Sequence, residues 1–111
     1  MTVSEQQHTA FDAGLAALQQ SFRDSLEGRI LNLEAATALL RRDKLHKQAL
    51  VLIRRDCHKI AGIAESLGFG QIGRFAASID LMFAKDRASW PDIEAPVEKL
   101  LDAMEAGLEQ A

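Results

Sequence analysis

"CHKIAGIAESLGFGQIG", residues 57–73, has the apolar spacing of a helix and then a turn rich in glycine. The same stretch carries a histidine at position 58 and, one helical turn later, a glycine at position 62. A glycine inside a helix costs about 1 kcal/mol relative to alanine, so its presence needs a reason. The direction of the histidine and the space left by the glycine therefore bear on function.

The rotation of this helix follows from its apolar residues. At 3.6 residues per turn, one face carries a continuous apolar stripe, which we assign to the core. The stripe consists of Ala49, Ile53, Cys57, Ile60, Ala64 and Leu67. His58 lies about 160° from Ile60 on the helical wheel, so its ring is predicted to face solvent.

The neighbours of His58 distinguish it from an ordinary surface histidine, which would show the same orientation. Val51, Gly62 and Glu65 share its face of the helix. Arg54 and Arg55 flank it on the preceding turn, about 40° and 60° away. Because Gly62 has no Cβ, the backbone of another protein has room to approach the imidazole.

The chain before this helix predicts a long first helix over residues 11–40. Its apolar positions recur at helical spacing as Phe11, Leu15, Leu18, Phe22, Ile30, Leu33, Thr37 and Leu40. The phase slips at residues 24–28, which predicts either one bent helix or two collinear ones. Gly28 favours a bend at that place.

The helix that carries His58 is predicted over residues 45–67, with Gly68 as its C-cap. The next helix is predicted over residues 70–84. A last helix is expected to be capped by Asp92, which would put Pro96 in the first turn; an earlier start would make Pro96 a kink. Four amphipathic helices with short connections predict an all-α fold, an antiparallel up-down four-helix bundle. We place it at residues 10–111, after a flexible N-terminus at residues 1–9.

Composition narrows the function. Hydrophobic residues make up 48% and aromatic residues 5%, so the core must be aliphatic. The formal net charge of -3 argues against nucleic acid as a partner. No apolar run is long enough to span a membrane, and the N-terminus lacks the features of a secretory signal. A single cysteine excludes an internal disulfide and fits a reducing compartment, so a cytoplasmic location is expected.

Residues 58–69, "HKIAGIAESLGF", resemble the signature of histidine phosphotransfer (HPt) domains of bacterial two-component phosphorelays. That signature is a histidine, an apolar residue at +2, glycine at +4, a small residue at +6, an apolar residue at +9 and glycine at +10. The match continues without gaps through "QIGRFAASID", and the resemblance covers roughly residues 10–109. It implies that His58 accepts a phosphoryl group and exchanges it with an aspartate of a response-regulator receiver domain. It also implies no kinase or ATPase activity of its own, and the sequence has no phosphate-binding G-x-x-x-x-G-K-[ST] loop.

The resemblance also indicates which residues of this chain occupy functional positions of the family. Many family members have lysine at +3 from the histidine, where this chain has Ala61. Arg54, Arg55 and Lys59 are the candidates to supply the missing charge on the phosphoryl group. In the phosphotransfer domains of chemotaxis kinases a glutamate at +22 orients the histidine, and Asp80, shorter by one methylene, occupies that position here.

The chemistry requires a neutral imidazole with a free lone pair. Nε2 is the better exposed nucleophile, and Nδ1 then carries the proton and benefits from a carboxylate acceptor. Asp80 is the first candidate for that acceptor. Glu65 is the second, and a solvated surface acid is an equally good reading of it.

The expected partners are a receiver domain and a sensor or hybrid histidine kinase, bound by a monomer. We predict the partner-binding residues to be Val51, Ala61, Gly62, Glu65, Gly68 and Phe69. No metal or cofactor site is expected, because His8, His46 and His58 do not cluster; the Mg²⁺ that receivers need would come from the receiver's own acidic pocket.

Three alternative functions stay open. The bundle could bind a receiver or kinase without transferring phosphate, a reading that Ala61 favours. A histidine kinase dimerisation domain ranks lower, because Lys59 follows the histidine and no proline is near. A general helical scaffold has the spaced motif against it.

Overall fold

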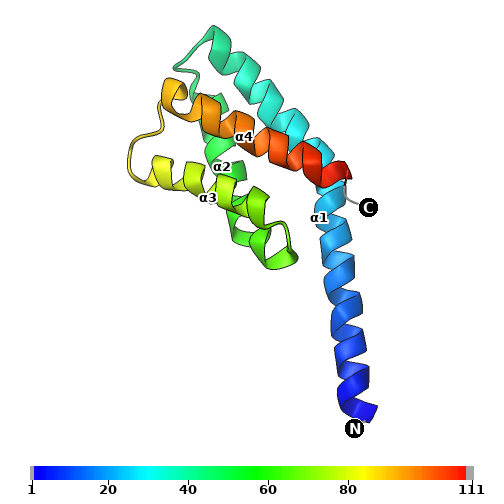
Figure 1. Cartoon of the computed structure of the whole chain (residues 1–111). Coiled ribbons are helices and arrows are strands. Elements are labelled where there is room, and N and C mark those ends of the chain that lie inside the picture. The colour runs from blue at the N-terminus through cyan, green and yellow to red at the C-terminus, as the bar shows by residue number, and fades with distance from the viewer. Residues whose placement is uncertain (1, 110–111) are drawn as a thin grey trace.

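The computed structural model describes residues 2–109, with side chains from residue 9. Its helices are α1 (Thr2–Arg42), α2 (Lys47–Ile63), α3 (Gly70–Ala84) and α4 (Trp90–Glu109), with a short 3₁₀ turn, η1 (Glu65–Leu67), after α2. Successive helices reverse direction, and α1 and α3 each pack against both α2 and α4 (Figure 1). The predicted all-α four-helix bundle is confirmed, and residues 2–109 contain no strand.

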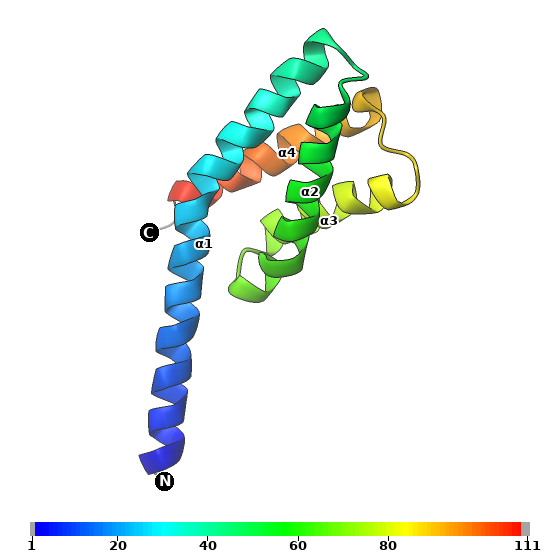
Figure 2. The same cartoon turned by 180° about the vertical axis from the view of Figure 1, so that it is seen from behind.

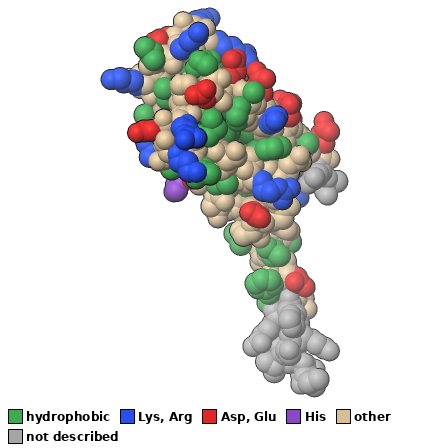
Figure 3. Space-filling model, turned by 60° about the vertical axis from the view of Figure 1, so that its left-hand side comes forward, with side chains coloured by type: hydrophobic (Ala, Val, Ile, Leu, Met, Phe, Trp, Pro, Cys, Tyr) green, Lys and Arg blue, Asp and Glu red, His purple; other side chains and the backbone are tan. Residues whose placement is uncertain are grey.

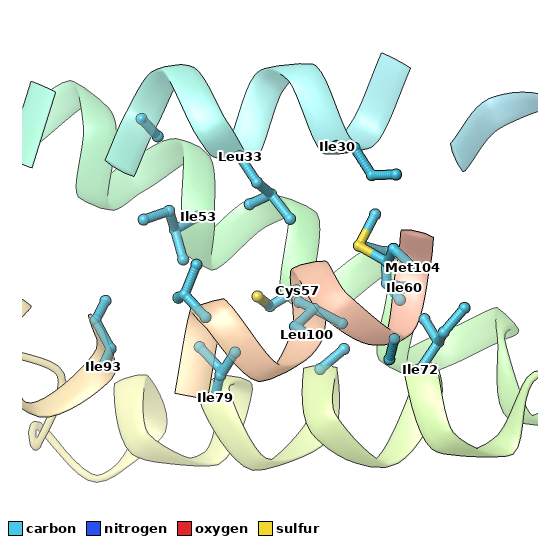
Figure 4. Packing of buried hydrophobic residues seen from close by; sticks show 14 of the residues in the cluster. Ile30, Leu33, Ile53, Cys57, Ile60, Ile72, Ile79, Ile93, Leu100 and Met104 are labelled. Carbon is cyan, nitrogen blue, oxygen red and sulfur yellow. The ribbon is translucent and has the colours of Figure 1, made fainter. Parts of the chain in front are cut away.

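The core runs along the axis of the bundle and is almost wholly aliphatic. In Figure 4 Ile53 and Cys57 from α2 point towards Leu33 of α1, Ile79 of α3 and Leu100 of α4. The predicted core stripe of α2 is buried from Ala49 to Ala64, whereas Leu67, in η1, is only half-buried. This burial fixes the rotation of α2 and thereby the direction of every residue on its outer face.

α1 extends beyond the bundle at its N-terminal end (Figures 1 and 2). Phe11 and Leu18, two of the apolar positions at helical spacing in α1, are 68% and 59% exposed and are not part of the core. Gly107, near the end of α4, packs against Leu26, and η1 reaches the level of Gln19, whose side chain donates a hydrogen bond to the carbonyl oxygen of Leu67. Leu18 therefore borders a groove beside η1, and the part of α1 before it projects from the bundle. Figure 3 shows hydrophobic side chains on this projection. Flexibility of residues 1–9 stays a prediction, since the side chains of residues 1–8 lie outside the described part of the chain.

α1 is one continuous helix that changes direction in its light-blue part, as both ribbon views show. The bend expected near residues 24–28 therefore occurs within a single helix. Ser25 Oγ donates a hydrogen bond of 2.6 Å to the carbonyl oxygen of Phe22. Such a bond competes with the backbone ladder and bends helices.

The ends of α2 differ from the prediction. The helix begins at Lys47 rather than near residue 45, because His46 acts as its N-cap and accepts a hydrogen bond from Ala49 N at 3.2 Å. It ends at Ile63, and the chain tightens into η1 before Gly68. Gly68 adopts φ 91°, the left-handed conformation that suits glycine, so its predicted capping role holds for the end of η1.

α4 starts two residues before the predicted cap. The backbone N–H groups of Asp92 and Ile93 donate to the carbonyl of Ser89, and Ser89 Oγ donates to the Asp92 carboxylate at 2.7 Å. Asp92 therefore lies within the first turn and is not the cap. Pro96 falls inside the helix, where it has no N–H to donate to the carbonyl one turn earlier, yet α4 continues to Glu109.

Candidate functional site

His58 lies on the outer face of α2, as its helical phase predicts. Its side chain is 76% exposed, whereas Cys57 beside it and Ile60 one half-turn on are fully buried. These two buried neighbours hold the helix in the rotation that presents the imidazole to solvent. The ring is therefore accessible to another protein without any movement of the bundle.

Asp80 of α3 lies within hydrogen-bond distance of the imidazole. Its Oδ2 lies 3.0 Å from His58 Nδ1, a good hydrogen-bond distance. An ionised carboxylate can only accept hydrogen bonds, so Nδ1 must carry the proton. In the neutral ring this leaves the lone pair on Nε2, on the side away from Asp80. The shorter acid therefore reaches the ring, and Glu65, the other candidate, lies past the end of α2 in η1.

His58 stands in a surface depression between α2 and α3. The depression is lined by Val51, Arg54, Arg55, His58, Asp80 and Ala84. Lys59, in contrast, lines a different groove on the α1 side of α2, together with Asp56. Of the three candidate cations, Arg54 lines the depression of His58, Arg55 lines both this depression and the second groove, and Lys59 lines the second groove alone.

α3 contributes more residues to this surface than Asp80, the one residue of α3 that the sequence analysis identified. Ala84 lines the depression, and Leu81 is more than half exposed beside Asp80. The available signal was the four-residue spacing of Asp80 and Ala84, which puts both on one helical face.

The predicted partner-binding residues divide into two groups. Val51, Gly62, Glu65 and Gly68 are exposed, and Ala61 is half-buried against the core. Phe69 does not belong to the exposed surface, and that prediction is wrong. It is only 7% exposed, and its ring lies 4.9 Å from that of Phe22, where the pair closes one end of the core.

Gly62 lies in open space. A Cβ at this position would have no heavy atom within 4 Å, apart from its own helix backbone and chain neighbours. The residue is next to last in α2, so it is in the final turn and not in the middle of a helix. No packing contact within the bundle therefore requires glycine here. Glycine at this position is explained either by the approach of a partner protein or by the ending of α2 one residue later.

Cys57 is part of the core and not of the site. Burial raises the pKa of its thiol to about 12, and the charges of Asp56 and Asp80 act in the same direction. The thiolate is the reactive form, so at neutral pH this cysteine behaves as a small hydrophobic residue.

The polar residues of the bundle form no metal centre of the usual kind. Among the side chains that the structure describes, those of residues 9–109, no group of three or more His, Cys, Asp or Glu is placed to hold a metal ion. His46 is engaged as the cap of α2, and the side chain of His8 lies outside the described residues. Within the described helices, none has the combined length and apolarity needed to cross a membrane.

Comparison with known protein families gives a match that covers most of the chain. A sequence model of the family described as "Hpt domain" matches residues 17–110. The matched region contains His58, Asp80 and both arginines of the depression, and it begins where α1 joins the bundle. No match was found among curated proteins or among solved structures.

Proposed function

The chain belongs to the Hpt domain family, which carries out histidine phosphotransfer in two-component signalling, and from that premise we propose that its partner in exchange is a receiver domain. In this proposal Nε2 of His58 accepts a phosphoryl group from the phosphorylated aspartate of one receiver and passes it to the aspartate of another. A sensor or hybrid histidine kinase supplies the phosphate at the start of the relay.

The observation that carries the proposal is the contact between His58 Nδ1 and Asp80 Oδ2 at 3.0 Å, on a ring that is 76% exposed. It leaves a fixed lone pair on Nε2, where a phosphorus atom has room to approach in line. In the forward step the P–N bond forms as the P–O bond to the aspartate breaks, and the electron pair of that bond stays on the released carboxylate. The reverse step regenerates the neutral imidazole.

Arg54 and Arg55 are suited to the charge of the transferring group. Phosphoryl transfer proceeds through a loose transition state whose negative charge spreads over the equatorial oxygens, and catalysis is mainly positioning and electrostatic stabilisation. Both residues line the depression that holds His58. We propose that they replace the lysine that many relatives carry where this chain has Ala61, and that Lys59, in the other groove, does not.

The partner surface that we propose is small and suited to brief contact. It comprises the outer face of α2 around His58 together with Val51, Gly62, Leu81 and Ala84. Two arginines in this surface give it a positive field that complements the acidic pocket of a receiver. The Mg²⁺ of receiver chemistry would be held by that pocket, and no step of the proposal needs a metal bound to this chain.

Phosphate transfer from a radiolabelled, phosphorylated receiver tests the proposal. The wild-type protein should take up label from a cognate receiver, and the His58→Gln protein should take up none, because only an imidazole at this site offers the nucleophile. His46→Gln is the matched control. It removes the other described histidine, the N-cap of α2, and this variant should take up label as the wild-type protein does. Screening all receivers of the host in this assay identifies the partner.

Two outcomes contradict the proposal. Labelling of the His58→Gln protein would assign the acceptor elsewhere. Binding of a receiver by the wild-type protein, with no transfer to or from any receiver, would instead favour a non-catalytic interaction module.

A further inference from the structure

Gly73, near the start of α3, marks a very close approach between helices. It is buried, and a Cβ at this position would lie 3.0 Å from the backbone nitrogen of Glu65, 3.1 Å from its Cβ and 3.3 Å from its Cα. The nearest of these atoms belongs to the backbone of η1, which has no side-chain rotamer to change. Any residue other than glycine would therefore force α3 and η1 apart by a few tenths of an ångström.

Gly73 and Asp80 point in nearly the same direction from α3. They are seven residues apart, which is about 700° of helical rotation, so their directions differ by only about 20°. Gly73 faces η1, and Asp80 faces His58 in the preceding helix. A movement of α3 that relieves a contact at Gly73 is therefore the movement that draws Asp80 away from the imidazole.

The hydrogen bond between Asp80 and His58 tolerates only a small movement of α3. The distance from Asp80 Oδ2 to His58 Nδ1 is 3.0 Å. Side-chain hydrogen bonds of this type weaken beyond about 3.2 Å, so a displacement of a few tenths of an ångström is enough to reduce this one. A glutamate would bridge a wider gap between the helices, and an aspartate does not.

We propose that Gly73 is a positioning residue for the His58 site: the missing side chain lets α3 approach η1 closely enough for the short Asp80 side chain to reach Nδ1. Gly73 acts through Asp80 and touches neither the phosphoryl group nor the partner. The geometric part of the proposal concerns the unphosphorylated protein, and only its effect on transfer rests on the proposed function.

Nitrogen NMR of the imidazole in the unphosphorylated protein tests this directly, because it reports which ring nitrogen carries the proton. Gly73→Ala should shift His58 from the Nδ1–H form towards the Nε2–H form. Its transfer rate should fall, by no more than in Asp80→Ala, which removes the acceptor altogether. Gly28→Ala is the matched control, since Gly28 is also helical but has nothing within 4 Å of its Cβ position, and it should leave the ring signals and transfer unchanged.

Rescue separates positioning from general damage to the fold. In the Gly73→Ala, Asp80→Glu protein the longer acid should bridge the wider gap, restore the Nδ1–H signal and recover transfer relative to Gly73→Ala alone. Wild-type ring signals in Gly73→Ala would overturn the proposal. So would a loss of these signals that Asp80→Glu does not restore.

A second variant covers the case in which Gly73→Ala fails to fold. Asp80→Glu alone changes a half-exposed side chain and keeps the close packing at Gly73. At the wild-type spacing of α2 and α3, the longer glutamate side chain must bend to reach Nδ1. The Nδ1–H signal and the transfer rate should therefore not exceed those of the wild type. A gain in both would show that α3 is not set for a short acid, which contradicts the proposal. If the wild-type protein takes up no phosphate, the proposed function fails, while the ring signals still decide the role of Gly73.

Discussion

His58 combines two properties that oppose each other in most side chains, namely exposure and a fixed orientation. Its ring is open to solvent, so the core does not restrict it, and the single contact with Asp80 sets its tautomer. Ion pairs and hydrogen bonds at exposed positions contribute little to stability, with a median of about 0–1 kcal/mol. We therefore attribute the Asp80 contact to orientation of the nucleophile and not to the stability of the bundle.

Gly62 provides a test of approach at the scale of one residue. Gly62→Gln should raise the free energy of unfolding by up to about 1 kcal/mol, because glutamine is the better helix former and the site is open. Phosphorylation of His58 by the small donor phosphoramidate should be unchanged. Transfer to and from a receiver should fall steeply, because the new side chain occupies the route by which a partner backbone reaches Nε2. Unfolding curves and transfer rates measure the two effects separately.

The control for this test is Gly28→Gln, a change of the same type at an open helical position on α1, distant from His58 in sequence. It should give a similar gain in stability with no loss of transfer. Exchange at the wild-type rate by the Gly62→Gln protein would remove the steric interpretation of Gly62.

How much could be predicted for single residues depended on the helix that carries them. The exposure of His58 and the burial of Cys57 followed from the phase of α2, because a helix with one apolar stripe has a defined rotation. Phe69 was misassigned because it lies in a turn, where no periodicity indicates which way a side chain points. Its contact with Phe22 joins residues far apart in sequence, and only the packed structure brings them together.

At the scale of elements, the turn between α2 and α3 sets the spacing on which the site depends. Gly68 closes η1 with φ 91°, and it returns the chain so that α3 packs along α2. The conformation of this one residue therefore helps to place Asp80 opposite His58.

The glycines of the chain should respond to alanine in opposite directions. Gly68→Ala should lower the free energy of unfolding by about 1 kcal/mol or more, because alanine is strained at positive φ. Gly28→Ala should raise it by roughly 0.5–1 kcal/mol, since alanine is the better helix former and meets no neighbour there. Urea unfolding of both variants measures the pair. If the free energy of unfolding changed with the same sign in both variants, the explanation from backbone conformation at Gly68 and Gly28 would be contradicted.

Element boundaries were predictable where one signal dominated. α3 has the predicted bounds, residues 70–84, because a glycine turn precedes it and a polar loop follows it. The start of α4 was ambiguous because Ser89 and Asp92 are both good capping residues. Burial of Trp90 in the core decides it, since the helix must begin early enough to place that ring inside.

At the scale of the whole molecule, the bundle and the projecting part of α1 are distinct. The apolar spacing of α1 continues through Phe11 and Leu18, although both side chains are mostly exposed. Periodicity shows that a helix has an apolar face but not how long its neighbours are, so this difference could not be predicted. The family match begins at residue 17, near the point where α1 enters the bundle.

The charge of the whole protein and the charge of its site have opposite signs. The formal net charge is -3, yet the depression around His58 contains two arginines and one acid. A mildly acidic protein with a locally positive site disfavours nucleic acid and suits a single phosphoryl group presented by an acidic partner pocket. Composition predicted the overall charge, and the stretch "RRDCHK" predicted the basic surroundings of His58; the structure adds that Asp80 of α3 shares the depression with the two arginines.

The central claim is that Asp80 holds the proton on Nδ1 so that Nε2 of His58 receives the phosphoryl group. The most direct measurement is combined phosphorus and nitrogen NMR of the protein after phosphorylation by its receiver, with the histidine rings labelled with ¹⁵N. We expect a single phosphorus signal coupled to Nε2 of His58. Coupling to Nδ1, or a phosphorus signal on any other residue, would contradict it.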